Sequence, residues 1–169
     1  LKYIRNNRLV LTLLVMGLAT TLLAMPYRFL LPVFVVDVYG RGSDAYGWLV
    51  TLGGVGTMIG AILISWLGAW KRGLFLILGS IISAIGLIML AALPFYITAL
   101  GVMVLLGLGD AARRTLNQAL IMSNVDDAYQ ARVMSVFMLN FGLMPLGVLP
   151  AGIAMEYWGG PLVIGILGI

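Results

Sequence analysis

Two charged residues stand out because they fall inside stretches that are otherwise almost wholly apolar. Arg28 lies between Pro26 and Pro32 in AMPYRFLLP, and Asp110 lies in GLGDAARR. Away from water, a carboxylate can carry a proton, and a guanidinium can bind an anionic or carbonyl-rich group. These residue types therefore predict proton or ligand binding within an apolar environment.

Each of the two residues also has a structural interpretation. Tyr27 and Arg28 can reach toward a membrane surface, because a long cationic side chain buries its stem and exposes its charge. Asp110 can form a local ion pair, since Arg113 and Arg114 follow it at i+3 and i+4 of a helix. We favour the local pair for Asp110, and both roles stay open for Arg28.

Asp110 also ends the run Gly107-Leu108-Gly109-Asp110, which matches the GxGD motif of intramembrane aspartyl proteases. Such chemistry needs two carboxyl groups that share a proton at one depth. The upstream candidate, Asp37, is expected about 20 Å of helix from Asp110. In a chain with 22 glycines a chance match is unsurprising. We therefore expect no enzyme, with a protease using Asp37 and Asp110 as a minor alternative.

The elements that position these residues must be built from a very apolar chain. Charged residues make up 9% of the sequence, against about 25% in a soluble domain. This composition predicts an integral membrane protein whose first partner is the lipid bilayer. The absence of cysteine and histidine removes thiol chemistry and histidine relays. We expect no metal, cofactor or nucleic-acid partner, because the basic residues also form no cluster larger than a pair.

A membrane-crossing helix needs about 20 mostly apolar residues. The runs predict an all-α bundle in one transmembrane domain, 1–169, with a polar link at 113–132. A sixth run is too short to cross, so we expect the last span to be truncated. The predicted helices are about 9–38, 46–70, 73–93, 95–121 and 133–155, followed by a partial helix at 161–169.

The first predicted helix is too long to cross straight. Pro26 and Pro32 each remove a backbone donor, so we expect the second half of this span to be kinked or partly unwound. Gly53, Gly56 and Gly60 place small residues on one face of the second span. Such a face indicates close helix packing, or a surface that slides during gating.

Polar residues near the other spans suggest further roles. Asn140 should lie in the inner half of the fifth span, where it can bond to another helix or contact a substrate. Asp126 and Asp127 precede that span and suit its positive helix end. Placing the N-terminal end in the cytoplasm puts eight of the ten basic residues inside. A cytoplasmic charge cluster is then expected from Arg113, Arg114, Asp126, Asp127 and Arg132.

Two stretches are similar to a known family. LLPVFVVDVYGRGSDAYGWLVTLGGVGTMIGA resembles the seventh-to-eighth helix region of major facilitator superfamily exporters, and DDAYQARVMSVFMLNFGLMPLGVLPAG resembles their eleventh helix. The resemblance implies the C-terminal half of a twelve-helix fold built from inverted three-helix repeats. It implies as partner an N-terminal six-helix half of the same parent chain. The drug- and siderophore-export branch is the most similar.

The resemblance implies a secondary active transporter that works by alternating access. We expect proton-driven efflux of amphipathic small molecules, by an antiporter in a bacterial inner membrane. Uptake of a hydrophilic solute by a symporter or facilitator is the alternative. The residues expected to face the transport cavity are Arg28, Tyr27, Asp110 and Asn140.

Overall fold

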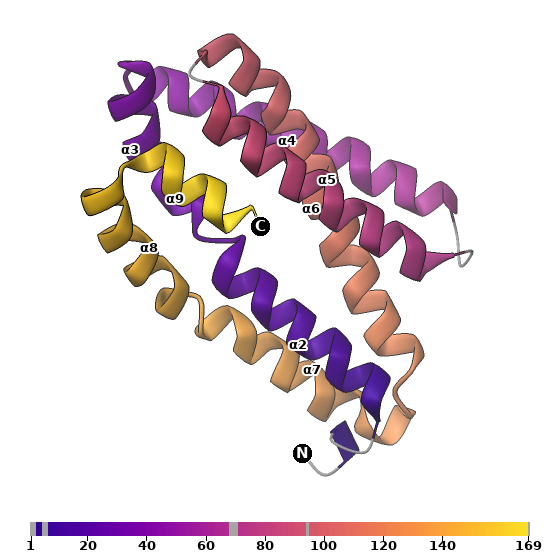
Figure 1. The fold of residues 1–169 in the computed structure, drawn as a ribbon. Helices are drawn as coiled ribbons and strands as arrows, with labels where there is room; N and C mark the ends of the chain where they lie inside the picture. The colour runs from indigo at the N-terminus through magenta and orange to yellow at the C-terminus, as the bar shows by residue number, and fades with distance from the viewer. Residues whose placement is uncertain (1–2, 5–6, 68–70, 94, 169) are drawn as a thin grey trace.

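The computed structural model describes residues 3–4, 7–67, 71–93 and 95–168. Within these ranges the chain is almost entirely helical and contains no strand, which confirms the all-α prediction. Figure 1 shows the arrangement of the helices. Their bounds are α2 (Arg8–Leu23), α3 (Tyr27–Tyr39), α4 (Ser43–Leu67), α5 (Arg72–Ala92), α6 (Tyr96–Ser123), α7 (Asp127–Gly142), α8 (Pro145–Trp158) and α9 (Gly160–Leu167).

Five stretches of the described chain are long and apolar enough to cross a membrane, as the sequence predicted. Two of them consist of a pair of successive helices, α2 with α3 and α7 with α8. The predicted end of the second span at 70 and the last residue, 169, lie outside the described residues. The five stretches are Arg8–Tyr39, Ser43–Trp66, Arg72–Ala92, Tyr96–Ser123 and Asp127–Trp158.

Helix α6 contacts α4 through facing glycines. A Cβ added to Gly56 would collide with the backbone carbonyl of Val104, and one added to Gly107 would collide with the carbonyl of Gly53. At Gly60 an added Cβ would lie 2.9 Å from the Leu108 carbonyl oxygen. The glycine face of α4 therefore packs directly on the backbone of α6.

The opposite contact of α6, with α5, uses a second set of small residues. A Cβ on Gly79 would lie 2.7 Å from that of Ala112, and one on Gly109 would lie 2.7 Å from the carbonyl oxygen of Gly79. Within α6, Gly107 thus faces α4 and Gly109 faces α5. The two glycines of the GxGD run are explained by backbone-to-backbone packing, which small residues permit.

The first membrane-crossing stretch is interrupted rather than continuous. α2 ends at Leu23, three residues form turns, and Pro26 is the N-cap of α3. Proline is tolerated there because its missing N–H would find no helical partner at a helix start. Pro32 instead lies inside α3, which is helical from Tyr27 to Tyr39. Of the two predicted alternatives, kinked or partly unwound, the second is wrong, because the residues from Tyr27 to Tyr39 stay helical and the interruption lies at residues 24–26.

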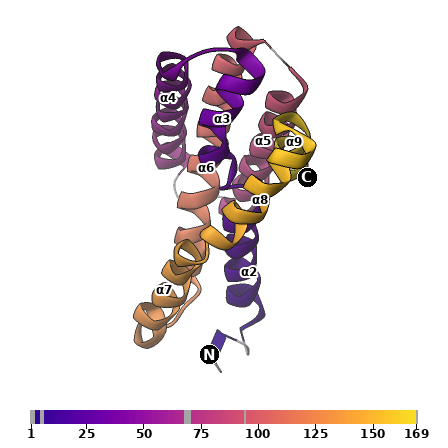
Figure 2. The ribbon, with the colours of Figure 1, turned by 90° about the vertical axis from the view of Figure 1, so that its left-hand side faces the viewer.

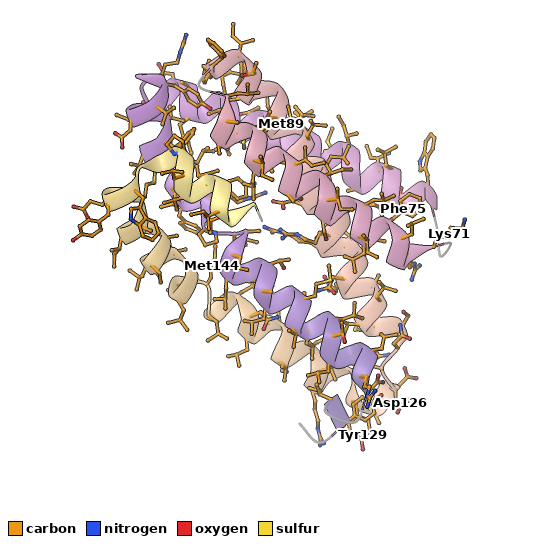
Figure 3. All side chains as sticks on the ribbon, viewed as in Figure 1. Lys71, Phe75, Met89, Asp126, Tyr129 and Met144 are labelled. Atoms are coloured by element: carbon orange, nitrogen blue, oxygen red, sulfur yellow. The ribbon has the colours of Figure 1, made fainter. Side chains whose placement is uncertain are left out.

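The fifth stretch starts earlier than predicted. Helix α6 ends at Ser123, close to the predicted end at 121, but α7 begins at Asp127 rather than at 133, so most of the polar link at 113–132 is helical. Hydropathy marks where a chain becomes polar, whereas a helix can continue past that point. The stretch then breaks at Leu143 and Met144, before Pro145 starts α8. Met144 is labelled at this break in Figure 3.

The two interrupted stretches contact each other next to their breaks. A Cβ added to Gly147, on the first turn of α8, would collide with the backbone carbonyl of Leu22 on the last turn of α2. Figures 1 and 2 show α2 beside α7 and α8, with α4, α5 and α6 grouped on the other side. The bundle therefore has a layer of straight helices and a layer of broken ones.

Candidate functional site

A buried carboxylate joins the two layers. Asp110 lies on α6 with its side chain 4% exposed. Its Oδ2 accepts from Arg28 Nη2 at 3.0 Å and from the Tyr27 hydroxyl at 3.3 Å. Its Oδ1 accepts from Arg113 Nη2 at 2.8 Å. Tyr27 and Arg28 form the first turn of α3, directly after the proline break, so the break places them against α6.

The two arginines bonded to Asp110 have different surroundings. The Arg113 side chain is 7% exposed and lies one helical turn from Asp110 on α6. The Arg28 side chain is 42% exposed, and its Nε donates to the Tyr27 hydroxyl at 3.3 Å. Arg114 donates instead to the Met25 sulfur at 3.3 Å. We call Tyr27, Arg28, Asp110, Arg113 and Arg114 the Asp110 cluster.

The Asp110 cluster contains three guanidinium groups and one carboxylate, so its formal charge is strongly positive. Arg113 is fixed beside Asp110 by its position on the same helix, whereas Arg28 reaches Asp110 from another helix. Protonating the carboxyl group would weaken both ion pairs. The Arg28 side chain is more exposed than that of Arg113, so Arg28 can move away from Asp110 more easily than Arg113 can.

A cavity of about 240 Å³ opens beside Arg28, between α3, α4 and α6. Apart from Arg28, its lining residues are apolar except for Tyr46 and Thr57. A space of this kind suits part of an amphipathic small molecule, with the guanidinium as its polar contact. The cavity is lined by Arg28, Leu31, Tyr46, Val50, Gly53, Gly54, Thr57 and Met103.

A smaller polar pocket, of about 30 Å³, lies on the other side of Arg113. Asn140 belongs to this pocket and not to the hydrogen bonds around Asp110. The sequence-predicted cavity residues thus separate into two neighbouring places, with Tyr27, Arg28 and Asp110 together in the first. The polar pocket is lined by Gly17, Thr20, Thr21, Met25, Arg113, Arg114, Asn117, Phe137, Asn140 and Phe141.

The structure divides the expected cytoplasmic charge cluster. Arg113 and Arg114 belong to the Asp110 cluster, and about 15 Å of helix separates Arg113 from the end of α6 at Ser123. Asp126 is the N-cap of α7, without a side-chain capping bond, and Asp127 lies in its first turn. Asp126 and Tyr129 lie together at one end of the molecule in Figure 3. Arg132 is on α7 and exposed.

The aspartyl-protease alternative has no matching geometry. Asp37 is exposed near the end of α3, while both oxygens of Asp110 accept hydrogen bonds from arginine or tyrosine. The described residues also contain no group of three or more His, Cys, Asp or Glu side chains that could hold a metal ion.

Buried ion pairs inside a bundle of membrane-crossing helices are characteristic of transport proteins. Residues 1–167 match the Major Facilitator Superfamily model, and the chain belongs to this superfamily. It is similar to the Staphyloferrin A transporter of Staphylococcus aureus (strain NCTC 8325 / PS 47), with 28% identity over 157 residues. That match covers 85% of this chain and 36% of the relative, so the chain spans about a third of the relative's length. No solved structure matches the chain.

Proposed function

We propose that the protein is a secondary active transporter that exports an amphipathic, drug- or siderophore-like small molecule in exchange for protons. Alternating access moves the molecule across a bacterial inner membrane. The observation that carries the proposal is the buried Asp110 carboxylate, shared between Arg113 on its own helix and Arg28 on another.

In this proposal Asp110 carries the proton. When Asp110 is ionised, it holds Arg28 and Tyr27 against α6. In this position Arg28 lines the adjoining 240 Å³ cavity and binds the polar part of the substrate. When Asp110 is protonated, Arg28 loses its anionic partner and leaves this position, so the substrate is released. Proton binding and substrate binding thus exclude each other, as the exchange of the two requires.

The direction of transport and the substrate class are supported by similarity. The exporter direction rests on the resemblance of the two quoted stretches to the drug- and siderophore-export branch, and the relative is named Staphyloferrin A transporter. The chain is proposed to form the C-terminal half of a twelve-helix fold, as inverted three-helix repeats. An N-terminal six-helix half of the same parent chain supplies the other wall of the cavity.

Transport is tested with the complete reading frame in inverted membrane vesicles. An imposed pH gradient should drive uptake of a fluorescent amphiphile, and Asp110→Asn should abolish this gradient dependence. Arg28→Ala should reduce uptake by at least tenfold at unchanged expression. Asp37→Asn, an exposed aspartate on the same helix as Arg28, is the matched control and should transport normally. Gradient-dependent uptake that is unchanged by both Asp110→Asn and Arg28→Ala would exclude the proposed coupling.

The orientation has its own test, because the 169 residues contain no cysteine. Single cysteines at Gly42 and Asp126 lie at opposite ends of the proposed spans. A membrane-impermeant maleimide added to intact cells should label Gly42→Cys and leave Asp126→Cys unlabelled. The reverse pattern would place the N-terminal end of this segment outside the cell.

A further inference from the structure

Three residues that line the polar pocket each have one buried polar atom without a hydrogen-bond partner: Arg113 Nε, Asn117 Oδ1 and Asn140 Nδ2. Their residues are only 5–7% exposed. A buried polar atom left unpaired is unfavourable, so three around one pocket are expected to share a ligand.

The types of these three atoms restrict what that ligand is. Arg113 Nε and Asn140 Nδ2 are donors, whereas Asn117 Oδ1 is an acceptor. A metal cation would face two N–H groups and a guanidinium charge, and an anion would face the Asn117 oxygen. A water molecule accepts from both donors and donates to the acceptor. Its second hydrogen can go to Thr21 in the same pocket, whose hydroxyl hydrogen is already donated to the Gly17 carbonyl at 2.9 Å.

The size of the pocket agrees with this chemistry. A volume of about 30 Å³ exceeds the roughly 10–15 Å³ that one water requires. Gly17 provides part of this space. A Cβ at Gly17 would lie 3.0 Å from Asn117 Nδ2, 3.4 Å from Asn140 Nδ2 and 3.5 Å from the Phe137 ring.

We propose that the polar pocket binds one resident water molecule, which bridges Arg113 and Asn117 of α6 to Asn140 of α7. Arg113 is then held at both edges of its guanidinium, by Asp110 at Nη2 and by the water at Nε. The water joins the Asp110 cluster to the interrupted span α7–α8. This assignment is independent of what the protein transports.

Selective labelling of asparagine with ¹⁵N in the complete protein tests the site directly. The side-chain amide protons of Asn140 should show a nuclear Overhauser cross-peak to a long-lived water. Gly17→Ala places a methyl group in the pocket and should remove that cross-peak. Gly101→Ala is the matched control, since its Cβ would meet nothing within 4 Å, and should preserve it. A missing cross-peak in the unmodified protein, or one that survives Gly17→Ala, would overturn the assignment.

A thermal double-variant cycle provides a second measurement if Gly17→Ala does not fold. Asn117→Leu and Asn140→Leu should each lower the unfolding midpoint by about 3 °C. The double variant should lose little more than either single variant, because one bridging water serves both side chains. The control double variant combines Asn140→Leu with Asn124→Leu, at the exposed α6–α7 turn. Its unfolding midpoint should fall by the sum of the two single shifts. Additive losses for Asn117 and Asn140 would overturn the shared water.

Discussion

The straight layer and the broken layer both contain close glycine contacts, but the helices of the broken layer are interrupted. In the straight layer, α4 and α5 touch α6 backbone to backbone through Gly56, Gly107 and Gly109. In the broken layer, α2–α3 and α7–α8 are each interrupted near the middle. Residues of α2 and α7 line the polar pocket together with Arg113, Arg114 and Asn117 of α6. Close glycine contacts tolerate little displacement, whereas a break concentrates changes of backbone angle in a few residues. The comparison indicates that the straight layer is a rigid frame and that the broken layer moves relative to it.

The Asp110 cluster lies where the two layers meet, so its loss should have the largest effect. Asp110→Asn leaves the Arg113 guanidinium buried without its anionic partner. Breaking a buried ion pair in this way costs about 3–5 kcal/mol of folding stability. Thermal unfolding in detergent should show a correspondingly large drop in midpoint. Asp37→Asn, at an exposed position, should leave the unfolding midpoint unchanged. An equal drop in the midpoint of both variants would show that the ion pairs of Asp110 add no stability.

Gly56→Ala tests the rigidity of the frame. Its new methyl group meets the Val104 backbone, which cannot rotate away as a side chain can. The expected loss is about 1–3 kcal/mol, typical of overpacking. Gly54→Ala, two positions earlier with nothing within 4 Å, should be neutral or slightly stabilising in the same unfolding assay. A neutral Gly56→Ala would show that α4 and α6 can separate easily.

Gly147→Ala makes the corresponding change in the broken layer. Its methyl group meets the Leu22 carbonyl, but the nearby breaks at 24–26 and 143–144 allow the helices to shift. We expect a smaller loss of stability, about 1 kcal/mol or less, with a several-fold loss of transport. Gly152→Ala, in open space on the same helix, is the control. If Gly147→Ala and Gly56→Ala lost equal stability, the two layers would not differ in rigidity as proposed.

Tyr3→Ala should have the smallest effect. Tyr3 stacks on Tyr129 at a ring distance of 4.3 Å, and its hydroxyl accepts from the Asp126 backbone N–H at 3.1 Å. The stack lies at the surface, with Tyr129 38% exposed, so its removal should cost about 0.5 kcal/mol, the low end for aromatic pairs. Tyr157→Ala, 80% exposed on α8, should leave the unfolding midpoint unchanged. Equal midpoints for the two variants would show that the stack adds nothing.

Composition and hydropathy were sufficient to predict the fold class and the five spans, because burial in lipid demands long apolar helices. The i+3 spacing was also sufficient to identify the Asp110–Arg113 pair. The Arg28–Asp110 contact was not predictable, since it joins residues 82 positions apart across a break whose direction depends on packing. The break before Pro145 was missed because its apolar surroundings hide it, although Gly142 and Pro145 are turn residues.

The position of Asp110 along α6 has a mechanical consequence. α6 has 28 residues and contacts α4, α5 and α2. Asp110 lies close to its midpoint, with about 20 Å of helix on either side. Because α4 and α5 pack on the backbone of α6, the three helices would move as one body. A tilt of this body by about 10° around Asp110 would move each end of α6 by about 3.5 Å in opposite directions. Protonation of Asp110 would thus change the position of α6 at both membrane surfaces.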